Sequence, residues 1–172
     1  PSLGPTAFLF FTAPMSASAS PRNTVIGHAI GVVVGYCSLV LTGLAQAGPA
    51  LALGVTGPRI LAVGLSFAAT SYLMVVLRAH HAPATATTLL IALGILPHPR
   101  QLVVVMLAVL LLTLQAYVFN RLLGIPYPRW RPVHDSASPT THRMSLVAQY
   151  EMSKKYSTSK MPAIPRQKRH LK

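Results

Sequence analysis

Three long stretches without an ionised side chain constrain the fold of this chain more than any other feature. They run from Thr24 to Ala45, from Ile60 to Leu77 and from Leu102 to Phe119. Each is close to the ~20 residues that a helix needs to cross ~30 Å of hydrocarbon. The sequence therefore predicts an all-α, polytopic transmembrane helical bundle, with full crossings at about 24–45, 58–77 and 101–120.

Acidic side chains are almost absent. The chain has two carboxylates, Asp135 and Glu151, and both follow the last crossing. The membrane region therefore lacks the groups that carry most acid–base catalysis, and we expect no enzyme and no catalytic residues. The seven histidines show no spacing typical of metal ligands, so we expect no metal and no cofactor. Bound lipid is the one small molecule that we expect.

The positive charge is concentrated near the C-terminus. Residues 1–120 contribute four arginines, whereas residues 121–172 contribute eleven Lys and Arg against two acids. This asymmetry divides the chain into a transmembrane domain, 1–125, and a basic extramembrane tail, 126–172. An excess of Lys and Arg directly after a membrane helix favours the matrix, stromal or cytoplasmic side. Anionic lipid is the alternative partner of such a tail, and nucleic acid is not expected.

The composition of the tail predicts a partner. From Arg131 onward it is rich in Ser, Thr, Pro, Lys and Arg, with one weak helical pattern from Met144 to Tyr156. Such a segment becomes ordered when it lies on another surface. We therefore expect residues 131–172 to contact other subunits of a membrane complex, and a homo-oligomer stays open. Just before the tail, Tyr127 and Trp130 are typical of aromatic anchors at the membrane interface.

Two shorter apolar stretches, at about 3–14 and 83–96, begin near prolines. As helices they span only ~15–20 Å, so each completes a crossing only with extended backbone. Pro5 precedes Pro21-Arg22 by the spacing that separates Pro83 from Pro99-Arg100, with an offset of 78 residues. The pattern predicts a duplicated, inverted unit of helix, short helix and helix.

The duplication also predicts an absent element. Shifting the run from Ile60 to Leu77 by the offset places its counterpart before Pro1, so we expect the first helix of the first repeat to be missing from this chain.

The positions of the arginines discriminate between two possible membrane topologies. If the segment 84–96 crosses the membrane, Arg22, Arg78 and the tail share the inner side, and Arg59 and Arg100 lie outside. If it is re-entrant, Arg22, Arg78 and Arg100 all lie outside. The excess of positive charge on the inner side favours the crossing.

Several segments of the chain resemble a known family. Leu3-Gly4-Pro5-Thr6-Ala7 with Pro21-Arg22-Asn23 and Gly27-His28, the segment His81-Ala82-Pro83-Ala84-Thr85, and Asn120-Arg121 with Tyr127-Pro128 are similar to motifs of the HPP integral membrane proteins. The likeness covers about residues 1–130. It implies a compact bundle of repeated helices, and some relatives are described as nitrite transporters. Ala82 and Thr85 depart from the signature, and aligning by it would shift the repeat offset by about three residues.

Candidate anion-binding residues follow from the repeats. Arg22 and Arg100 occupy equivalent Pro-Arg junctions, where two guanidinium groups would attract an oxyanion, or would cap helix ends or reach lipid phosphate. His28 lies one turn inside the first full helix, where it would carry a proton or bond a neighbouring helix. The remaining candidates are His81, Thr6, Thr85 and Thr87, whose groups lie near the starts of the short helices.

A glycine stripe is the remaining motif of the first full helix. Gly27, Gly31 and Gly35 follow one another at intervals of four residues, which allows a close helix contact, within the chain or between copies.

Two functions follow from these features. The sequence favours a non-catalytic accessory subunit of an organellar, energy-converting membrane complex, because one element is absent, the signature is altered and the tail is long and basic. The alternative is a transporter or channel for a small, nitrite-like anion. We expect a mitochondrial inner membrane or a plastid membrane, with a bacterial plasma membrane as the other location.

Overall fold

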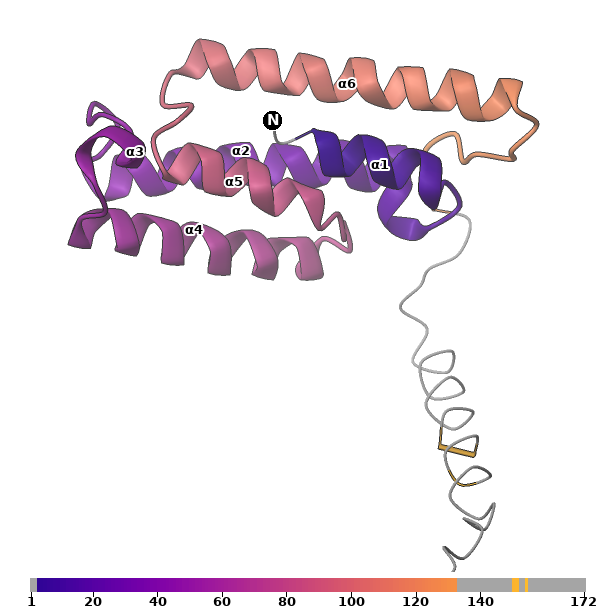
Figure 1. Cartoon of the computed structure of the whole chain (residues 1–172), viewed down its shortest axis with the longest axis horizontal. Coiled ribbons are helices and arrows are strands. Elements are labelled where there is room, and N and C mark those ends of the chain that lie inside the picture. Colours follow the sequence, from indigo (N-terminus) through magenta and orange to yellow (C-terminus); the bar gives the residue numbers. More distant parts are fainter. Residues whose placement is uncertain (1–2, 133–149, 152–153, 155–172) are drawn as a thin grey trace, which may run out of the picture. The chain divides into compact units, whose positions relative to one another are not determined.

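All elements that the structure describes are helical. The computed structural model describes residues 3–132, 150–151 and 154 (Figure 1). In chain order the elements are α1 (Gly4–Thr12), the 3-10 helix η1 (Ala17–Ala19), α2 (Pro21–Leu41), α3 (Ala50–Leu53), α4 (Gly57–Val76), α5 (Pro83–Ala92) and α6 (Pro99–Leu122). By length and composition, α2, α4 and α6 are able to cross a membrane. The predicted helical membrane bundle is thus confirmed.

The long helices begin at prolines. Pro21, Pro58 and Pro99 each occupy the first or second position of α2, α4 or α6. Proline suits this position because its fixed φ is helical and its missing N–H has no intrahelical partner there. Ser20 caps α2 by accepting a hydrogen bond from the Asn23 N–H. The helices therefore start one to three residues before the predicted crossings.

The short helix α5 packs against α2 through the glycine stripe. A Cβ added at Gly27 would lie 2.8 Å from the Cβ of His81, and one added at Gly31 would lie 2.7 Å from Thr88 Oγ1. Farther along α2, Gly35 faces Ile91 in the same way. Of the two alternatives for this stripe, the structure shows the contact within the chain.

The α5 helix is shorter than the predicted stretch 83–96. It ends at Ala92 because Gly94 adopts φ +75°, a conformation that favours glycine and stops a helix. Beyond it, residues 93–98 form turns and bends that lead to the start of α6, so the last part of the predicted stretch is not helical.

Two groups of arginines lie at opposite ends of the bundle. Arg22 donates to the carbonyls of Leu77 and Arg78 at the end of α4, and its backbone N–H donates to the Trp130 carbonyl after α6. Arg59, at the start of α4, lies at the other end, where α6 also begins (Figure 1). The chain thus passes from one end to the other through α5. This grouping is the one that the crossing of segment 84–96 predicts.

The two halves of the predicted duplication pack unequally. Shifted by 78 residues, the glycine stripe of α2 corresponds to Val105, Val109 and Thr113 of α6. Side chains at these positions keep α6 from the close helix contact that α2 makes, and α6 is the less buried of the two. Its contact with α1 includes Asn120, whose Nδ2 donates to the Phe10 carbonyl at 3.2 Å.

One predicted interfacial anchor is wrong. Tyr127 is fully buried, its ring lies edge-on to Phe10 and Tyr117 with centroids 6.3 Å apart, and its hydroxyl donates to the Ala19 carbonyl. Burial raises the pKa of Tyr127. The chain turns back after Gly124, at φ +76°, and so carries this ring into the core instead of the interface. Trp130, in contrast, is 49% exposed.

Arg59 joins the loops at its end of the bundle. Its guanidinium donates to the Ala92 carbonyl at the end of α5 at 3.1 Å and to the Gly48 carbonyl at 2.8 Å, and the side chain is 3% exposed. Guanidinium nitrogens also lie against Gly94. The arginine thus stabilises one carbonyl at the end of α5 and one in the loop before α3.

Replacing Arg59 by methionine is expected to lower the free energy of unfolding by about 3 kcal/mol, because two acceptors lose a charged donor. Arg100→Met is the matched control, since Arg100 also follows a proline at a helix start but is exposed. Unfolding in mixed detergent micelles, followed by circular dichroism, measures both. Equal stability of the two variants would contradict this role of Arg59.

The predictions for the tail fall mostly outside the described residues. The chain divides into two compact units, residues 1–135 and 136–172. Within the predicted helical pattern 144–156, the described residues Tyr150, Glu151 and Lys154 are helical. The predicted contacts of residues 131–172 with other subunits lie outside the described part from residue 133 onward, apart from these three residues.

Candidate functional site

Four of the predicted anion-binding residues meet in the core of the bundle. Thr6 of α1, His28 of α2, His81 of the α4–α5 loop and Thr87 of α5 are all fully buried. The Thr6 hydroxyl lies 3.0 Å from Nε2 of His28 and 3.2 Å from Nε2 of His81. The Thr87 hydroxyl lies 2.9 Å from Nδ1 of His28. We call these four residues the His–Thr cluster.

The starts of the two short helices meet at this cluster. Thr6 is the third residue of α1, and His81 comes two residues before α5. From there α1 and α5 extend in opposite directions (Figure 1). Each helix start carries a partial positive charge, although the Ala84 and Thr85 N–H groups of α5 already donate to the His81 and Ala82 carbonyls. The fold therefore directs two helix N-termini at one buried polar point beside α2.

The hydrogen bonds of the cluster form a directed chain. The Ser18 carbonyl lies 2.7 Å from Nδ1 of His81, so this nitrogen carries a proton and donates. In neutral His81 the other nitrogen, Nε2, is then an acceptor for the Thr6 hydroxyl. Thr6 in turn accepts from Nε2 of His28, whose Nδ1 accepts from the Thr87 hydroxyl. With both rings neutral, one arrangement of protons satisfies every contact.

Burial favours the neutral form of His81. This ring lies in the loop between α4 and α5, outside the three long helices. Desolvation by burial lowers the pKa of His81 to about 4, and the hydrogen bond to the Ser18 carbonyl raises it. The ring centroids of His28 and His81 are 5.0 Å apart. At this distance, a positive charge on one ring disfavours a second positive charge on the other.

Three further threonines of this core, Thr24, Thr70 and Thr88, lie outside the His–Thr cluster. Thr24 lies 3.4 Å from Nδ1 of His81, and the hydroxyls of Thr70 and Thr88 lie 3.2 Å apart. Thr24 is one helical turn before His28, so the helical period indicates that the two share a face. The position of Thr70 gave no such signal, because its partner is on another helix.

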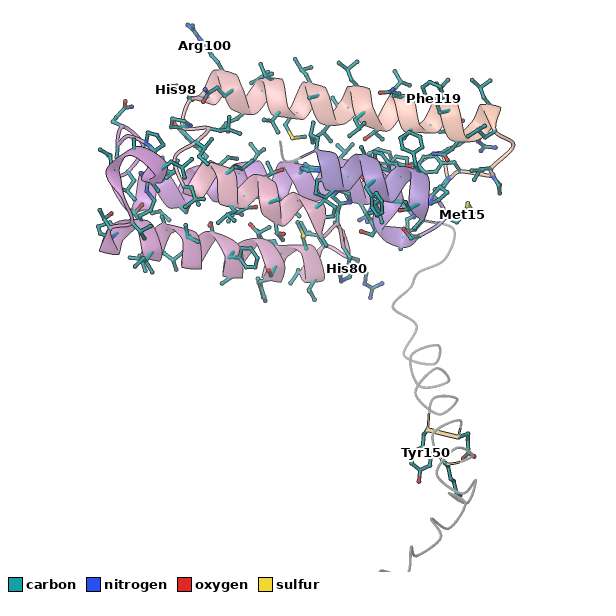
Figure 2. All side chains as sticks on the ribbon, viewed as in Figure 1. Met15, His80, His98, Arg100, Phe119 and Tyr150 are labelled. Atoms are coloured by element: carbon teal, nitrogen blue, oxygen red, sulfur yellow. The ribbon has the colours of Figure 1, made fainter. Side chains whose placement is uncertain are left out.

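The predicted arginine pair does not meet. Arg22 binds the carbonyls of Leu77 and Arg78, where α4 ends with Arg78 at φ 49° in the position that glycine usually takes. Arg100 is exposed and points away from the bundle at its other end (Figure 2). Because α2 and α6 run antiparallel, equivalent positions at their starts lie at opposite ends. Arg22 thus follows the helix-capping alternative.

Thr85 also lies apart from the cluster. Its hydroxyl donates to the Ala82 carbonyl, 2.8 Å away, at the start of its own helix. On α5, Thr87 and Thr88 face α2 and α4, and a step of two residues places Thr85 on another side of the helix.

The His–Thr cluster is closed and internally satisfied. In the described part of the chain, each buried side-chain nitrogen and oxygen has a hydrogen-bond partner. Among the same residues no three His, Cys, Asp or Glu side chains are placed to hold a metal ion. What the arrangement offers chemically is therefore hydroxyl and imidazole hydrogen bonding, at two helix N-termini and without a neighbouring carboxylate.

Comparisons with known proteins give one finding. The family model described as "HPP, transmembrane region" matches residues 1–128, which include every residue of the cluster. No curated protein and no solved structure matches the chain.

Proposed function

This chain belongs to the HPP transmembrane family and is an integral membrane protein, and we propose that it transports a small anion through the His–Thr cluster. The observation that carries this proposal is the meeting of two half-length helices, by their N-termini, at a buried polar site between membrane-spanning helices. Transporters bind anions at such discontinuous helices, because the helix dipoles and free N–H groups stabilise negative charge.

Charge supports an anion as the substrate. No Asp or Glu precedes Asp135, so no carboxylate repels an anion along the membrane region. Thr6 and Thr87 supply hydroxyl donors, and each neutral imidazole supplies one N–H donor and gains a second when a proton is added. A nitrite-like anion, small and planar with two acceptor oxygens, suits this set of donors.

The directed hydrogen-bond chain supports co-transport of a proton. Adding a proton at Nδ1 of His28 makes that ring a donor at both nitrogens. Transfer of its other proton through Thr6 to Nε2 of His81 would move the positive charge to His81, and loss of the Nδ1 proton of His81 on the far side would then leave both rings neutral. An anion that arrives with a proton crosses as a neutral pair, which lowers the cost of moving charge through a low-dielectric interior.

The test is nitrite uptake into liposomes that contain the purified chain. We expect Thr6→Val to lower the initial rate of uptake at least about tenfold. Valine has the same shape but no hydroxyl, so the hydrogen bonds that connect His28 to His81 are lost. Thr6→Ser keeps the hydroxyl and is expected to retain most of the rate. Protein-free liposomes measure passive entry of nitrous acid.

Arg100→Gln is the charge control, and the rate is expected to stay unchanged because Arg100 lies at the exposed end of α6. If uptake survived Thr6→Val but was lost in Arg100→Gln, the His–Thr cluster would be rejected as the anion-binding site, and the arginines would again be the candidates. Uptake equal to that of protein-free liposomes would reject transport.

A second candidate is a non-catalytic accessory subunit of a larger membrane complex, and the closed cluster favours it. A bundle whose buried polar groups already satisfy one another holds its shape without a substrate. The basic tail, which we place on the matrix, stromal or cytoplasmic side, would contact the other subunits. Fixed-stoichiometry co-purification with a large complex of an organellar membrane supports this role, and isolation of the chain alone or as a homo-oligomer contradicts it.

A further inference from the structure

A groove on the side of the bundle is not used by the proposed transport site. It encloses about 390 Å³ between α2, α6 and the segment that follows α6. Its lining is largely apolar and consists of Pro21, Val25, Leu110, Thr113, Leu114, Tyr117, Arg129 and Trp130. From Leu110 to Tyr117 the wall follows α6 for about two turns, or roughly 10 Å.

One end of the groove is positively charged. Arg129 lines it, is exposed and makes no hydrogen bond or ion pair with the residues that the structure describes. The Arg121 guanidinium lies 5.6 Å from the centre of the Tyr117 ring, another lining residue. Trp130, which is 49% exposed, stands beside Arg129. Tryptophan and arginine together at a helix end are typical of the level of lipid headgroups.

The charge at this end of the groove is complementary to an anionic ligand. No acidic residue of the chain precedes Asp135, so no carboxylate in the bundle neutralises Arg129 or Arg121. The Arg22 guanidinium is at the same end but is bound to the carbonyls that end α4. The groove thus offers a largely apolar wall along α6, one cation, Arg129, in its lining and a second, Arg121, against the lining ring of Tyr117.

We propose that this groove binds one anionic phospholipid, with an acyl chain along α6 and the phosphate at Arg129 and Arg121. Basic sites between membrane helices on the inner side bind anionic headgroups, and anionic lipids are concentrated in that leaflet. The groove opens at the end from which the basic tail leaves, where positive charge favours the inner side. This site does not depend on transport through the His–Thr cluster.

The test is native mass spectrometry of the purified full chain in detergent, titrated with dioleoylphosphatidylglycerol or with dioleoylphosphatidylcholine. We expect one molecule of the glycerol lipid per chain to be retained in preference to the choline lipid. Arg129→Gln is expected to weaken this binding about fivefold, the factor that corresponds to one cation near an anionic surface. Leu114→Trp, which fills the groove from the exposed side of α6, is expected to abolish the preference.

Arg100→Gln removes the same charge at the other end of α6 and is expected to leave the binding unchanged. Circular dichroism of each variant confirms that the helices are retained. Equal retention of both lipids would overturn the proposal, since the groove would then hold ordinary bilayer lipid. A preference that survives both Arg129→Gln and Leu114→Trp, or a second copy of the chain in place of lipid, would overturn it as well.

Discussion

Replacing Gly31 by alanine lowers the free energy of unfolding by about 3 kcal/mol or more, the expected result of forcing α2 and α5 apart. The added Cβ would lie 2.7 Å from Thr88 Oγ1 and 2.9 Å from the Ala84 carbonyl oxygen. Rotation of a side chain relieves the first contact, but the second is with backbone, so the helices must separate. That separation also loosens the neighbouring contact of Gly27 with His81.

Gly64→Ala is the matched control for Gly31→Ala. Gly64 lies inside α4, and nothing lies within 4 Å of an added Cβ. Alanine there is expected to stabilise the helix by up to about 1 kcal/mol, because glycine has the lower helix propensity. Both variants are measured by unfolding in mixed micelles with circular dichroism. If both substitutions raised stability alike, the stripe would not be a packing contact.

His28→Leu is expected to lower the free energy of unfolding by about 2–4 kcal/mol, because the buried Thr87 hydroxyl loses its imidazole partner and the Thr6 hydroxyl loses one of its two. The apolar side chain is of similar size, so the loss comes mainly from hydrogen bonding. His80→Leu changes an exposed neighbour of His81 and is expected to change stability by less than about 0.5 kcal/mol.

A double-mutant cycle separates the cluster from simple packing. Thr6→Val combined with His28→Leu is expected to cost less than the sum of the single substitutions, because each single change already breaks the same hydrogen bond. Mixed-micelle unfolding of the four proteins gives the coupling energy. Strict additivity would mean that the two residues do not share the bond seen in the structure.

The sequence predicted the fold class and the residues of the cluster better than the arrangement of the arginines. His28 was conspicuous because an ionisable group inside a membrane run is unusual, and Thr6, His81 and Thr87 because short helix starts expose backbone donors. These signals are local. The pairing of Arg22 with Arg100 instead assumed that equivalent positions converge, and the antiparallel course of α2 and α6 places them at opposite ends.

Tyr127 and Arg59 are two further residues whose tertiary contacts the sequence did not predict. As an aromatic residue after a membrane helix, Tyr127 was expected at the interface, but the turn after Gly124 buries it beside Phe10. Arg59 was considered only for its side of the membrane, and the structure places it on the carbonyls of Ala92 and Gly48. Neither contact is visible in the sequence, because its partners are distant along the chain.

The three long uncharged runs by themselves determined that this chain forms membrane helices, because hydrocarbon leaves the backbone no other way to satisfy its hydrogen bonds within one segment. Only the tertiary structure decided which side chains meet. Thr6 joins His28 to His81 only because α1, α2 and α5 lie close together. The glycine stripe permits this close approach along α2, whereas the bulkier side chains at the equivalent positions of α6 prevent it there. Helix formation depends on neighbours in sequence, whereas the site depends on contacts between segments as far apart as Thr6 and His81.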